Sequence, residues 1–284
     1  MPQTILDSFD VTDKVVVITG GGGELCGAMA VALGSIGAKV AVLDINRGKA
    51  EKTAETIEKS GGTAMARACD VLDTEDLEAC HESVRSCWGR VDMLIPGAGG
   101  NDPRGTTDLE FMGTGIQLAD PPQDFFDLDL DGFRYVFDLN FLSVFLTVRT
   151  FSRSMVEQGK GSIVNISSMS ALTPLTKIAA YSAAKAAVSN FTQWLAVHFS
   201  RTGVRVNALA PGFFMTEQLR FLHVDQKTGE LSERARNAIA HTPMGRYGNP
   251  EDLLGALIWL LSDASAFVTG IVVPVDGGFS AYTI

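Results

Sequence analysis

The sequence is poor in the features that mark several protein classes. It has only four cysteines among 284 residues, and no two of them form a Cys-x-x-Cys pair. Its 23 basic residues are outnumbered by 33 acidic residues, so the net charge is −10. Such a chain repels the phosphates of nucleic acids and of anionic lipids, and it has too few cysteines for a disulfide scaffold. We therefore expect a cytoplasmic protein with reduced thiols, and neither nucleic acid nor membrane as a partner.

A long uninterrupted apolar run is also absent. The most apolar stretch, Val15–Ala38, is divided by the four consecutive glycines Gly20–Gly23 into a β-branched run and a segment with helical periodicity. That pattern predicts a strand, a turn and a helix, and not a membrane span. The first residues contain no basic segment followed by an apolar one, so the sequence predicts no export signal. A hydrophobic content of 46% is sufficient for a full core.

Short apolar runs alternate with longer amphipathic stretches along the whole chain. The expected strands are Val15–Thr19, Val40–Asp44, Ala64–Ala68, Met93–Ile95, Ser162–Ile166, Arg205–Ala210 and Ile271–Pro274. The expected helices are Leu25–Ile36, Arg47–Lys59, Thr74–Trp88, Tyr135–Glu157, Ala180–Phe199 and Pro250–Leu261. This alternation predicts an α/β fold, a Rossmann-type doubly wound parallel sheet of about seven strands with helices on both faces.

Nothing in the composition divides the chain, because it contains no linker, repeat or low-complexity tract. We expect one domain over residues 1–284. Two stretches interrupt the alternation: the first excursion, residues 99–132, follows the fourth strand, and the second excursion, residues 217–248, follows the sixth. Ligands of open α/β sheets bind beyond the carboxyl ends of the strands. The two excursions are therefore expected to form the walls of a substrate site.

The first expected strand leads into a glycine-rich turn, TGGGGELCG. Such a turn lets backbone N–H groups approach a dinucleotide pyrophosphate at a helix N-terminus, although any tight turn between a strand and a helix needs glycine as well. Asp44 ends the second expected strand, where a carboxylate can accept hydrogen bonds from an adenosine ribose. It would repel the 2′-phosphate of NADP, which favours NAD. Arg47 follows closely and weakens this discrimination, and an ordinary helix cap is the alternative role for Asp44.

A second chemical signal lies in the segment YSAAK. Tyr181 and Lys185 are four residues apart, so in a helix their side chains project from one face. A tyrosine with a pKa of about 10 is a poor base at neutral pH, and a nearby ammonium favours its phenolate form. Ser168 ends the strand that precedes this helix, where its hydroxyl can bond the same substrate oxygen. The pattern indicates an acid–base site, although a solvent-facing Tyr–Lys pair has the same spacing.

These signals belong to a larger set of ordered motifs. The set consists of TGGGGELCG, Asp70-Val71, PGAGG, Asn140, NISS, YSAAK, NALAPGFFMT and VDGG. In order and near spacing, and over essentially the whole chain, it resembles the short-chain dehydrogenase/reductase family. The resemblance implies that Ser168 polarises a substrate carbonyl and that Tyr181 transfers a proton. It also implies that Lys185 lowers the pKa of Tyr181 and holds the nicotinamide ribose, while Asn140 anchors a water of the proton relay.

The same resemblance implies a nicotinamide cofactor and a homotetramer, with the last helix pair and the C-terminal segment VDGGFSAYTI as contact surfaces. NAD is expected rather than NADP, and the histidines lack the spacing of metal ligands, so no metal is expected. The implied cofactor-binding residues are Gly20, Gly22, Gly23, Leu25, Asp44, Asp70, Val71, Ala98, Gly99, Tyr181, Lys185, Pro211, Gly212, Phe214 and Thr216.

Three positions depart from the family pattern. Glu24 and Cys26 occupy the second and third glycines of TGxxxGxG, and Pro96 replaces the first asparagine of an NNAG-like segment. Glu24 must point away from the pyrophosphate, because like charges repel. Cys26 must move the helix away from the sheet or lean on Gly27, because a side chain replaces a hydrogen. These departures leave a second hypothesis, a dinucleotide-binding sensor without catalysis.

Features outside the catalytic motifs favour one branch of the family. The glycine-rich loop, the GAGGN turn, the long first excursion and the ending VDGGFSAYT resemble the D-mannonate oxidoreductase (fructuronate reductase) branch, which interconverts D-fructuronate and D-mannonate. Another sugar, a polyol or a 3-oxo compound is the alternative substrate. The carboxylate of a sugar acid needs a basic partner. The candidate substrate-binding residues are Asn101, Arg104, Lys177 and Arg220.

Overall fold

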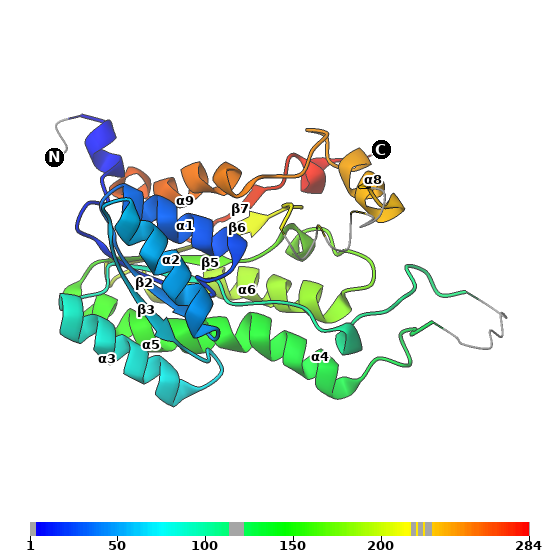
Figure 1. Cartoon of the computed structure of the whole chain (residues 1–284), viewed down its shortest axis with the longest axis horizontal. Coiled ribbons are helices and arrows are strands. Elements are labelled where there is room, and N and C mark those ends of the chain that lie inside the picture. The colour runs from blue at the N-terminus through cyan, green and yellow to red at the C-terminus, as the bar shows by residue number, and fades with distance from the viewer. Residues whose placement is uncertain (1–3, 114–121, 217–219, 221–223, 225–228, 284) are drawn as a thin grey trace.

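The protein is built around one parallel sheet. The structure is a computed structural model that describes residues 4–113, 122–216, 220, 224 and 229–283. Seven strands lie in the order β3-β2-β1-β4-β5-β6-β7 (Figure 1). They are β1 (Val15–Thr19), β2 (Lys39–Asp44), β3 (Thr63–Ala68), β4 (Met93–Pro96), β5 (Gly161–Ile166), β6 (Val204–Pro211) and β7 (Val272–Val275). The Rossmann-type parallel sheet predicted from the sequence is confirmed. Its strand order reverses direction between β1 and β4, which is where ligands of such sheets bind.

Helices cover both faces of the sheet. They are α1 (Glu24–Ser35), α2 (Arg47–Lys59), α3 (Thr74–Trp88), α4 (Leu130–Phe137), α5 (Ser143–Gln158), α6 (Ala179–His198), α8 (Glu233–Ala240) and α9 (Leu254–Leu261). One buried cluster joins α1, α2 and α9 to the sheet, and a second joins α3, α5 and α6. Val16 and Ile18 of β1 belong to the first cluster, and Val15 and Val17 belong to the second. Because strand side chains alternate between faces, a strand buried on both sides is a continuous apolar run.

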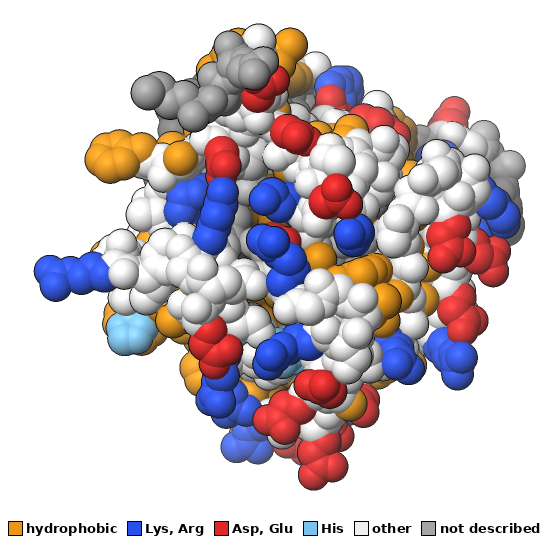
Figure 2. Space-filling model, turned by 90° about the vertical axis from the view of Figure 1, so that its left-hand side faces the viewer, with side chains coloured by type: hydrophobic (Ala, Val, Ile, Leu, Met, Phe, Trp, Pro, Cys, Tyr) orange, Lys and Arg blue, Asp and Glu red, His pale blue; other side chains and the backbone are white. Residues whose placement is uncertain are grey.

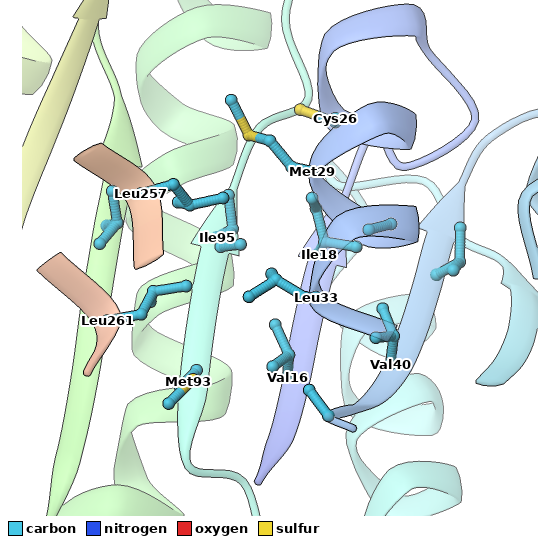
Figure 3. Close-up of a cluster of buried hydrophobic side chains, with 14 of the residues drawn as sticks. Val16, Ile18, Cys26, Met29, Leu33, Val40, Met93, Ile95, Leu257 and Leu261 are labelled. Carbon is cyan, nitrogen blue, oxygen red and sulfur yellow. The ribbon is translucent and has the colours of Figure 1, made fainter. Parts of the chain in front are cut away.

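The first cluster lies between α1 and the central strands. Figure 3 shows Met29 and Leu33 of α1 facing Ile18 of β1 and Ile95 of β4, with Leu257 of α9 beside them. All five side chains are fully buried. Complete burial of an aliphatic side chain contributes about 1.5–3 kcal/mol. This packing fixes α1, and with it the turn that precedes α1, relative to the carboxyl end of β1.

Capping side chains set the ends of α2 and α3. Asn46 Oδ1 accepts a hydrogen bond from Lys49 N at 3.1 Å, and Asp73 Oδ1 accepts one from Glu75 N at 2.8 Å. Such bonds satisfy backbone donors that have no partner within the helix. α3 is followed by Gly89 in the left-handed conformation, with φ of 76°. Both helices therefore begin and end at the residues that the sequence predicts.

The helix predicted at Tyr135–Glu157 is present, but it begins five residues earlier, ends one residue later and contains a π-helical turn. The structure has α4, then a π-helical turn at Asp138–Leu142, then α5. α4 begins before the predicted start because Asp129 caps it, accepting a hydrogen bond from Asp131 N at 3.2 Å. Single π-helical turns inside longer helices often lie at functional sites. This one contains Asn140.

The first excursion extends away from the sheet at the carboxyl end of the strands. Figure 1 shows its described part beyond the start of α4, on the side opposite the N-terminus. Phe111 and Phe126 of this excursion are 80% and 82% exposed. The second excursion contains α8, whose Ala235 and Ala238 pack with Tyr247. Phe221 and His223 lie outside the described residues.

The opposite end of the molecule is different in character. Figure 2 views the end where β1 begins, and acidic and basic side chains are interspersed over it. None of the described helices is long and apolar enough to cross a membrane.

Candidate active site

Main-chain contacts hold the ends of β1 and β4 together. Thr19 Oγ1 accepts hydrogen bonds from Gly97 N at 3.0 Å and from Ala98 N at 3.2 Å. Gly20 follows with φ of +66°, and a Cβ there would lie 2.9 Å from the Cα of Ala98. Only glycine satisfies both the conformation and the close approach. Gly20 and Ala98, both predicted to bind cofactor, therefore lie against each other at the switch point of the sheet.

The next glycine joins the turn to the end of β2. Gly22 N donates to Asp44 Oδ2 at 3.0 Å, and Asn46 N donates to Asp44 Oδ1 at 2.8 Å. A Cβ on Gly22 would lie 2.5 Å from Lys49 Cβ. Gly23 is the N-cap of α1 and provides no side-chain cap, so backbone N–H groups remain at that helix end. A tight turn at an uncapped helix N-terminus fits the pyrophosphate of a dinucleotide.

The residues predicted near the adenosine lie at neighbouring strand ends. Cys69 N donates to the carbonyl oxygen of Asp44 at 3.0 Å, which joins the segment after β3 to the end of β2. Asp70 Oδ1 accepts from Leu72 N at 2.9 Å, and the side chain of Val71 is buried. Asp44, Asp70 and Val71 thus come together at one edge, as the resemblance implies.

Ser168 and Tyr181 meet beyond the end of β5. Ser168 is 7% exposed, and its Oγ accepts hydrogen bonds from Ser170 N at 3.2 Å and from Ser170 Oγ at 3.0 Å. Burial raises the pKa of Tyr181, and a side-chain hydrogen bond with Ser168 partly offsets this rise. The two hydroxyls are therefore neighbours, as the sequence predicts for groups that share one substrate oxygen.

Lys185 lies behind this pair. It is 3% exposed, its Nζ donates to the carbonyl oxygen of Ile166 at 2.8 Å, and it lies 5.6 Å from the centroid of the Tyr181 ring. Burial lowers the pKa of Lys185 to about 8. The prediction that Lys185 lowers the pKa of Tyr181 stays a prediction. Burial is the larger effect on the phenol, and the ammonium is directed to the carbonyl of Ile166.

Asn140 fixes the segment that follows β4. Its Nδ2 donates to the carbonyl oxygens of Gly100 at 2.6 Å and Val136 at 2.7 Å, and its Oδ1 accepts from Gly100 N at 3.2 Å. A Cβ on Gly99 would lie 2.6 Å from Asn140 Oδ1 and 3.4 Å from Lys185 Nζ. Asn140 and Gly99 therefore belong to the same cluster as Lys185. The role of Asn140 in a proton relay stays a prediction.

The three departures from the family pattern have defined places in the fold. Cys26 is buried, and its Sγ lies 3.8 Å from the carbonyl oxygen of Gly97. The sulfur thus lies against Gly97, which has no side chain. From the sequence we expected a displaced helix or a contact with Gly27, and did not foresee this contact. Pro96 pairs with Thr19 at the last position of β4, and the side chain of Glu24 is exposed.

The residues after β6 are held by their neighbours. Gly212 N donates to the carbonyl oxygen of Val275 at 2.9 Å, and a Cβ on Gly212 would lie 2.6 Å from the Cα of Asp276. Phe214 is buried, and its ring packs so closely on Gly248 that a Cβ there would lie 2.6 Å away. The ring of Phe214 is core, so its backbone is the part available to a cofactor. Pro211, Leu25 and Thr216 occupy the same edge of the sheet or the helix ends beside it.

The candidate substrate residues differ in their partners and positions. Arg104 is paired with Asp102 at 2.9 Å and with Asp129 at 3.8 Å, while Asn101 and Arg220 are exposed. Lys177 lies on the loop between Ser168 and Tyr181, with φ of +74°.

The loop that carries Lys177 is docked to the first excursion. The carbonyl oxygen of Lys177 accepts a hydrogen bond from Thr107 N at 2.9 Å. Lys177 has no ion pair to any residue that the structure describes. A non-glycine residue with positive φ is uncommon, and such strain clusters at functional sites. The structure therefore separates Lys177 from Arg104, which is ion-paired.

A cavity of about 560 Å³ adjoins this loop. Its walls include Thr107 and Phe125 of the first excursion, Ser170 and Lys177. The wall formed by α6 consists of Ala179, Ser182, Ala183 and Ala186. At 3.6 residues per turn, this side of α6 faces away from Tyr181 and Lys185. The cavity thus adjoins the Ser168–Tyr181 pair through Ser170, which bonds Ser168.

The sequence reasoning missed two residues of the site. Thr19 bonds two backbone N–H groups of the β4 turn, and Ser170 donates to the catalytic hydroxyl of Ser168. Thr19 stood inside the noted motif TGGGGELCG, whereas Ser170 lies two residues beyond the noted motif NISS. The partners of Thr19 are distant in sequence, and the contact of Ser170 with Ser168 depends on a local turn. Motif spacing therefore revealed neither contact.

Comparison with known proteins gives this geometry a family. A family model described as enoyl-(acyl carrier protein) reductase matches residues 25–280. The chain belongs to the short-chain dehydrogenase/reductase family. It is therefore an oxidoreductase that acts on CH–OH groups with a nicotinamide cofactor, as the motifs predict.

Several relatives match over nearly their whole length. The uncharacterized oxidoreductase UxuB of Bacillus subtilis (strain 168) is 49% identical over 96% of this chain and 97% of its own. The 5-keto-D-gluconate 5-reductase of Escherichia coli (strain K12) is 32% identical, with coverage of 96% and 97%. A crystal structure of a provisionally assigned D-mannonate oxidoreductase from Haemophilus influenza, with bound NAD, is 47% identical with a TM-score of 0.91. It covers 96% of this chain and 97% of that one.

Proposed function

We propose that this short-chain dehydrogenase/reductase interconverts a keto sugar acid and its alcohol with NAD(H), with D-fructuronate and D-mannonate as the substrate pair. The observation that carries the proposal is the cluster of Ser168, Tyr181 and Lys185 beside the glycine turn. It provides two hydroxyls for one carbonyl oxygen and a buried ammonium behind them. The choice of a sugar acid rests on the provisionally assigned D-mannonate oxidoreductase, which is 47% identical over nearly the full chain.

The end of β2 supports NAD as the cofactor. Asp44 directs its carboxylate toward the glycine turn, where it accepts the N–H of Gly22. A 2′-phosphate beside this carboxylate would be repelled. Arg47, which the sequence left as a possible counter-charge, is paired with Glu51 at 2.7 Å on the exposed side of α2. The crystallised relative also holds NAD.

The mechanism follows from the protonation states of the cluster. Bound NADH supplies the hydride. Burial raises the pKa of Tyr181, so at neutral pH the phenol carries the proton that a new alkoxide requires. Ser168 donates a hydrogen bond to the carbonyl oxygen and polarises it. Below its pKa of about 8, Lys185 is an ammonium and stabilises the phenolate that remains once Tyr181 has donated its proton.

The substrate carboxylate needs a cation near this cluster. Lys177 is the best candidate, because it lies between Ser168 and Tyr181 in the chain and has no ion pair among the described residues. Arg104 already contacts the carboxylates of Asp102 and Asp129. A charge-assisted hydrogen bond from Lys177 would favour a keto acid over the corresponding neutral sugar.

A second candidate substrate is 5-keto-D-gluconate. It is named by the relative that is 32% identical. D-fructuronate is D-mannonate oxidised at C5, and D-mannonate and D-gluconate differ only in configuration at C2. The two keto acids therefore present the same reacting carbonyl and the same carboxylate. A non-catalytic sensor is disfavoured, because Ser168, Tyr181, Lys185 and Asn140 are all present in one cluster.

The test is a substrate panel with the purified protein. NADH oxidation is followed with D-fructuronate, with 5-keto-D-gluconate and with D-fructose, which is D-fructuronate with an alcohol in place of the carboxylate. We expect the highest kcat/KM with D-fructuronate and a preference for NADH over NADPH. A rate with D-fructuronate no higher than that of the Tyr181→Phe variant would overturn the proposal. A higher kcat/KM with 5-keto-D-gluconate would assign the enzyme to the C2 epimer.

A further inference from the structure

Two unusual positions of the chain meet beside the cofactor-binding edge. Cys26 stands in the first turn of α1, where the family pattern has glycine, and Gly97 follows Pro96, where the pattern has an asparagine. Cys26 Sγ lies 3.8 Å from the carbonyl oxygen of Gly97, and Figure 3 shows Cys26 next to the segment that follows β4. A Cβ built on Gly97 would overlap this sulfur. The side chain of Cys26 therefore occupies the space that a side chain at position 97 would need.

We propose that Cys26 is a positioning residue for the cofactor, because its sulfur sets the path of residues 97–99 through contact with Gly97. The thiol fills the space between α1 and the end of β4 that a side chain at position 97 would otherwise occupy. Protein interiors are close-packed, so a residue in such a contact determines how near its neighbours lie.

The segment that Cys26 supports contacts both halves of the site. Gly97 N and Ala98 N donate to Thr19 Oγ1, and Ala98 packs against Gly20 of the glycine turn. The next residue, Gly99, lies close to Lys185 Nζ. A shift at residue 97 is thus passed to the turn that faces the pyrophosphate and to the lysine behind the catalytic phenol.

The chemistry of the thiol agrees with a spacer. Burial raises the pKa of Cys26 to about 12, so the sulfur is a neutral thiol at physiological pH. A neutral buried thiol is neither a nucleophile nor a metal ligand. Sulfur is large and polarizable, so it makes favourable packing contacts in an irregular gap.

The test is a double-mutant cycle with Cys26→Ala, Gly97→Ala and the double variant. The measurement is the Kd of NADH, by fluorescence titration of the folded protein. Gly97→Ala alone should raise the Kd about tenfold or more, because overpacking costs about 1–3 kcal/mol. Cys26→Ala should raise it about two- to threefold. In the Cys26→Ala background the substitution at Gly97 should have at least about fivefold less effect, because the sulfur is gone.

Controls separate positioning from a general loss of packing. Cys80→Ala removes another buried thiol, from α3, and should lower the melting temperature without changing the Kd of NADH. Cys26→Ser keeps a group of similar shape and should remain within about threefold of the wild-type Kd. Equal effects of Gly97→Ala in both backgrounds, or a change in melting temperature with no change in Kd, would overturn the inference. This inference rests on the cofactor site of the proposed function, so a wild-type protein that binds no NADH would overturn both. A wild-type protein that binds NADH but does not reduce D-fructuronate would contradict the proposed substrate and leave the cycle intact.

Discussion

The nucleotide-binding half of the molecule and its two excursions obey different constraints. In residues 15–100, the turn at Gly20 and Gly22 contacts β2, α2 and the end of β4 so closely that a Cβ would collide. In the first excursion, Phe111 and Phe126 are about four-fifths exposed. The first region is determined by contacts within the chain, whereas the first excursion exposes two large aromatic side chains to solvent. Substitutions in the nucleotide-binding half should therefore affect all substrates equally, and those beside the first excursion should affect only the choice of substrate.

The largest expected effect is a loss of kcat when the hydroxyl of Tyr181 is removed. Tyr181→Phe removes the proton donor and leaves the ring in place. We expect kcat to fall by about 10²–10⁴, the usual contribution of general acid–base catalysis, while the Kd of NADH stays within about twofold. Steady-state assays and a fluorescence titration measure the two quantities. Tyr135→Phe removes the hydroxyl of an exposed tyrosine on α4 and is the matched control. A variant that keeps more than a tenth of the wild-type kcat would contradict the assignment of Tyr181.

A substitution in the glycine turn should weaken cofactor binding for every substrate. A Cβ at Gly22 would lie 2.5 Å from Lys49 Cβ and 3.0 Å from Asp44 Oδ2. Overpacking of about 1–3 kcal/mol predicts that Gly22→Ala raises the Kd of NADH about ten- to a hundredfold. Gly255→Ala in α9 has open space around it and is the control, expected to leave the Kd unchanged. An unchanged Kd in Gly22→Ala would show that this turn can adjust without cost.

Features that depend on neighbouring residues could be predicted from the sequence, and features that depend on distant contacts could not. The ends of α2 and α3 were predictable because Asn46 and Asp73 cap them locally. Ser168, Tyr181 and Lys185 were predictable because helical periodicity and strand ends place them on one edge. The contact between Cys26 and Gly97 was not, because it joins residues 71 positions apart. The rise in the pKa of Tyr181 was not predictable either, since burial is a property of the folded chain.

A substitution beside the first excursion should change substrate preference and leave cofactor binding intact. Lys177→Met removes the proposed partner of the substrate carboxylate. A lost hydrogen bond to a charged group is worth about 1.5–3 kcal/mol, so we expect KM for D-fructuronate to rise about tenfold or more. KM for D-fructose and the Kd of NADH should be nearly unchanged. Arg104→Met removes a cation that is already paired, and should alter KM less than about twofold. Equal loss with both sugars would assign Lys177 a role in holding the loop instead.

The smallest expected effect is a pH dependence that originates at Lys185. Burial lowers the pKa of this ammonium to about 8, and reduction needs both the ammonium and the protonated phenol of Tyr181. The ammonium is present below this pKa and lost above it, so kcat/KM for reduction should be level below pH 7. It should fall to about half at pH 8 and about a tenth at pH 9, because kcat/KM reports the ionisation of the free enzyme.

Unfolding should not imitate this decline. The pKa of Lys185 lies below its ordinary value of 10.5, so between these two values the unfolded chain binds more protons than the folded one. The contribution of this group to stability therefore rises with pH over that range. A melting temperature measured across the same pH series separates the two effects. A kcat/KM profile that stays level to pH 10 would mean that Lys185 keeps its charge in the free enzyme, or that its charge takes no part in the reaction.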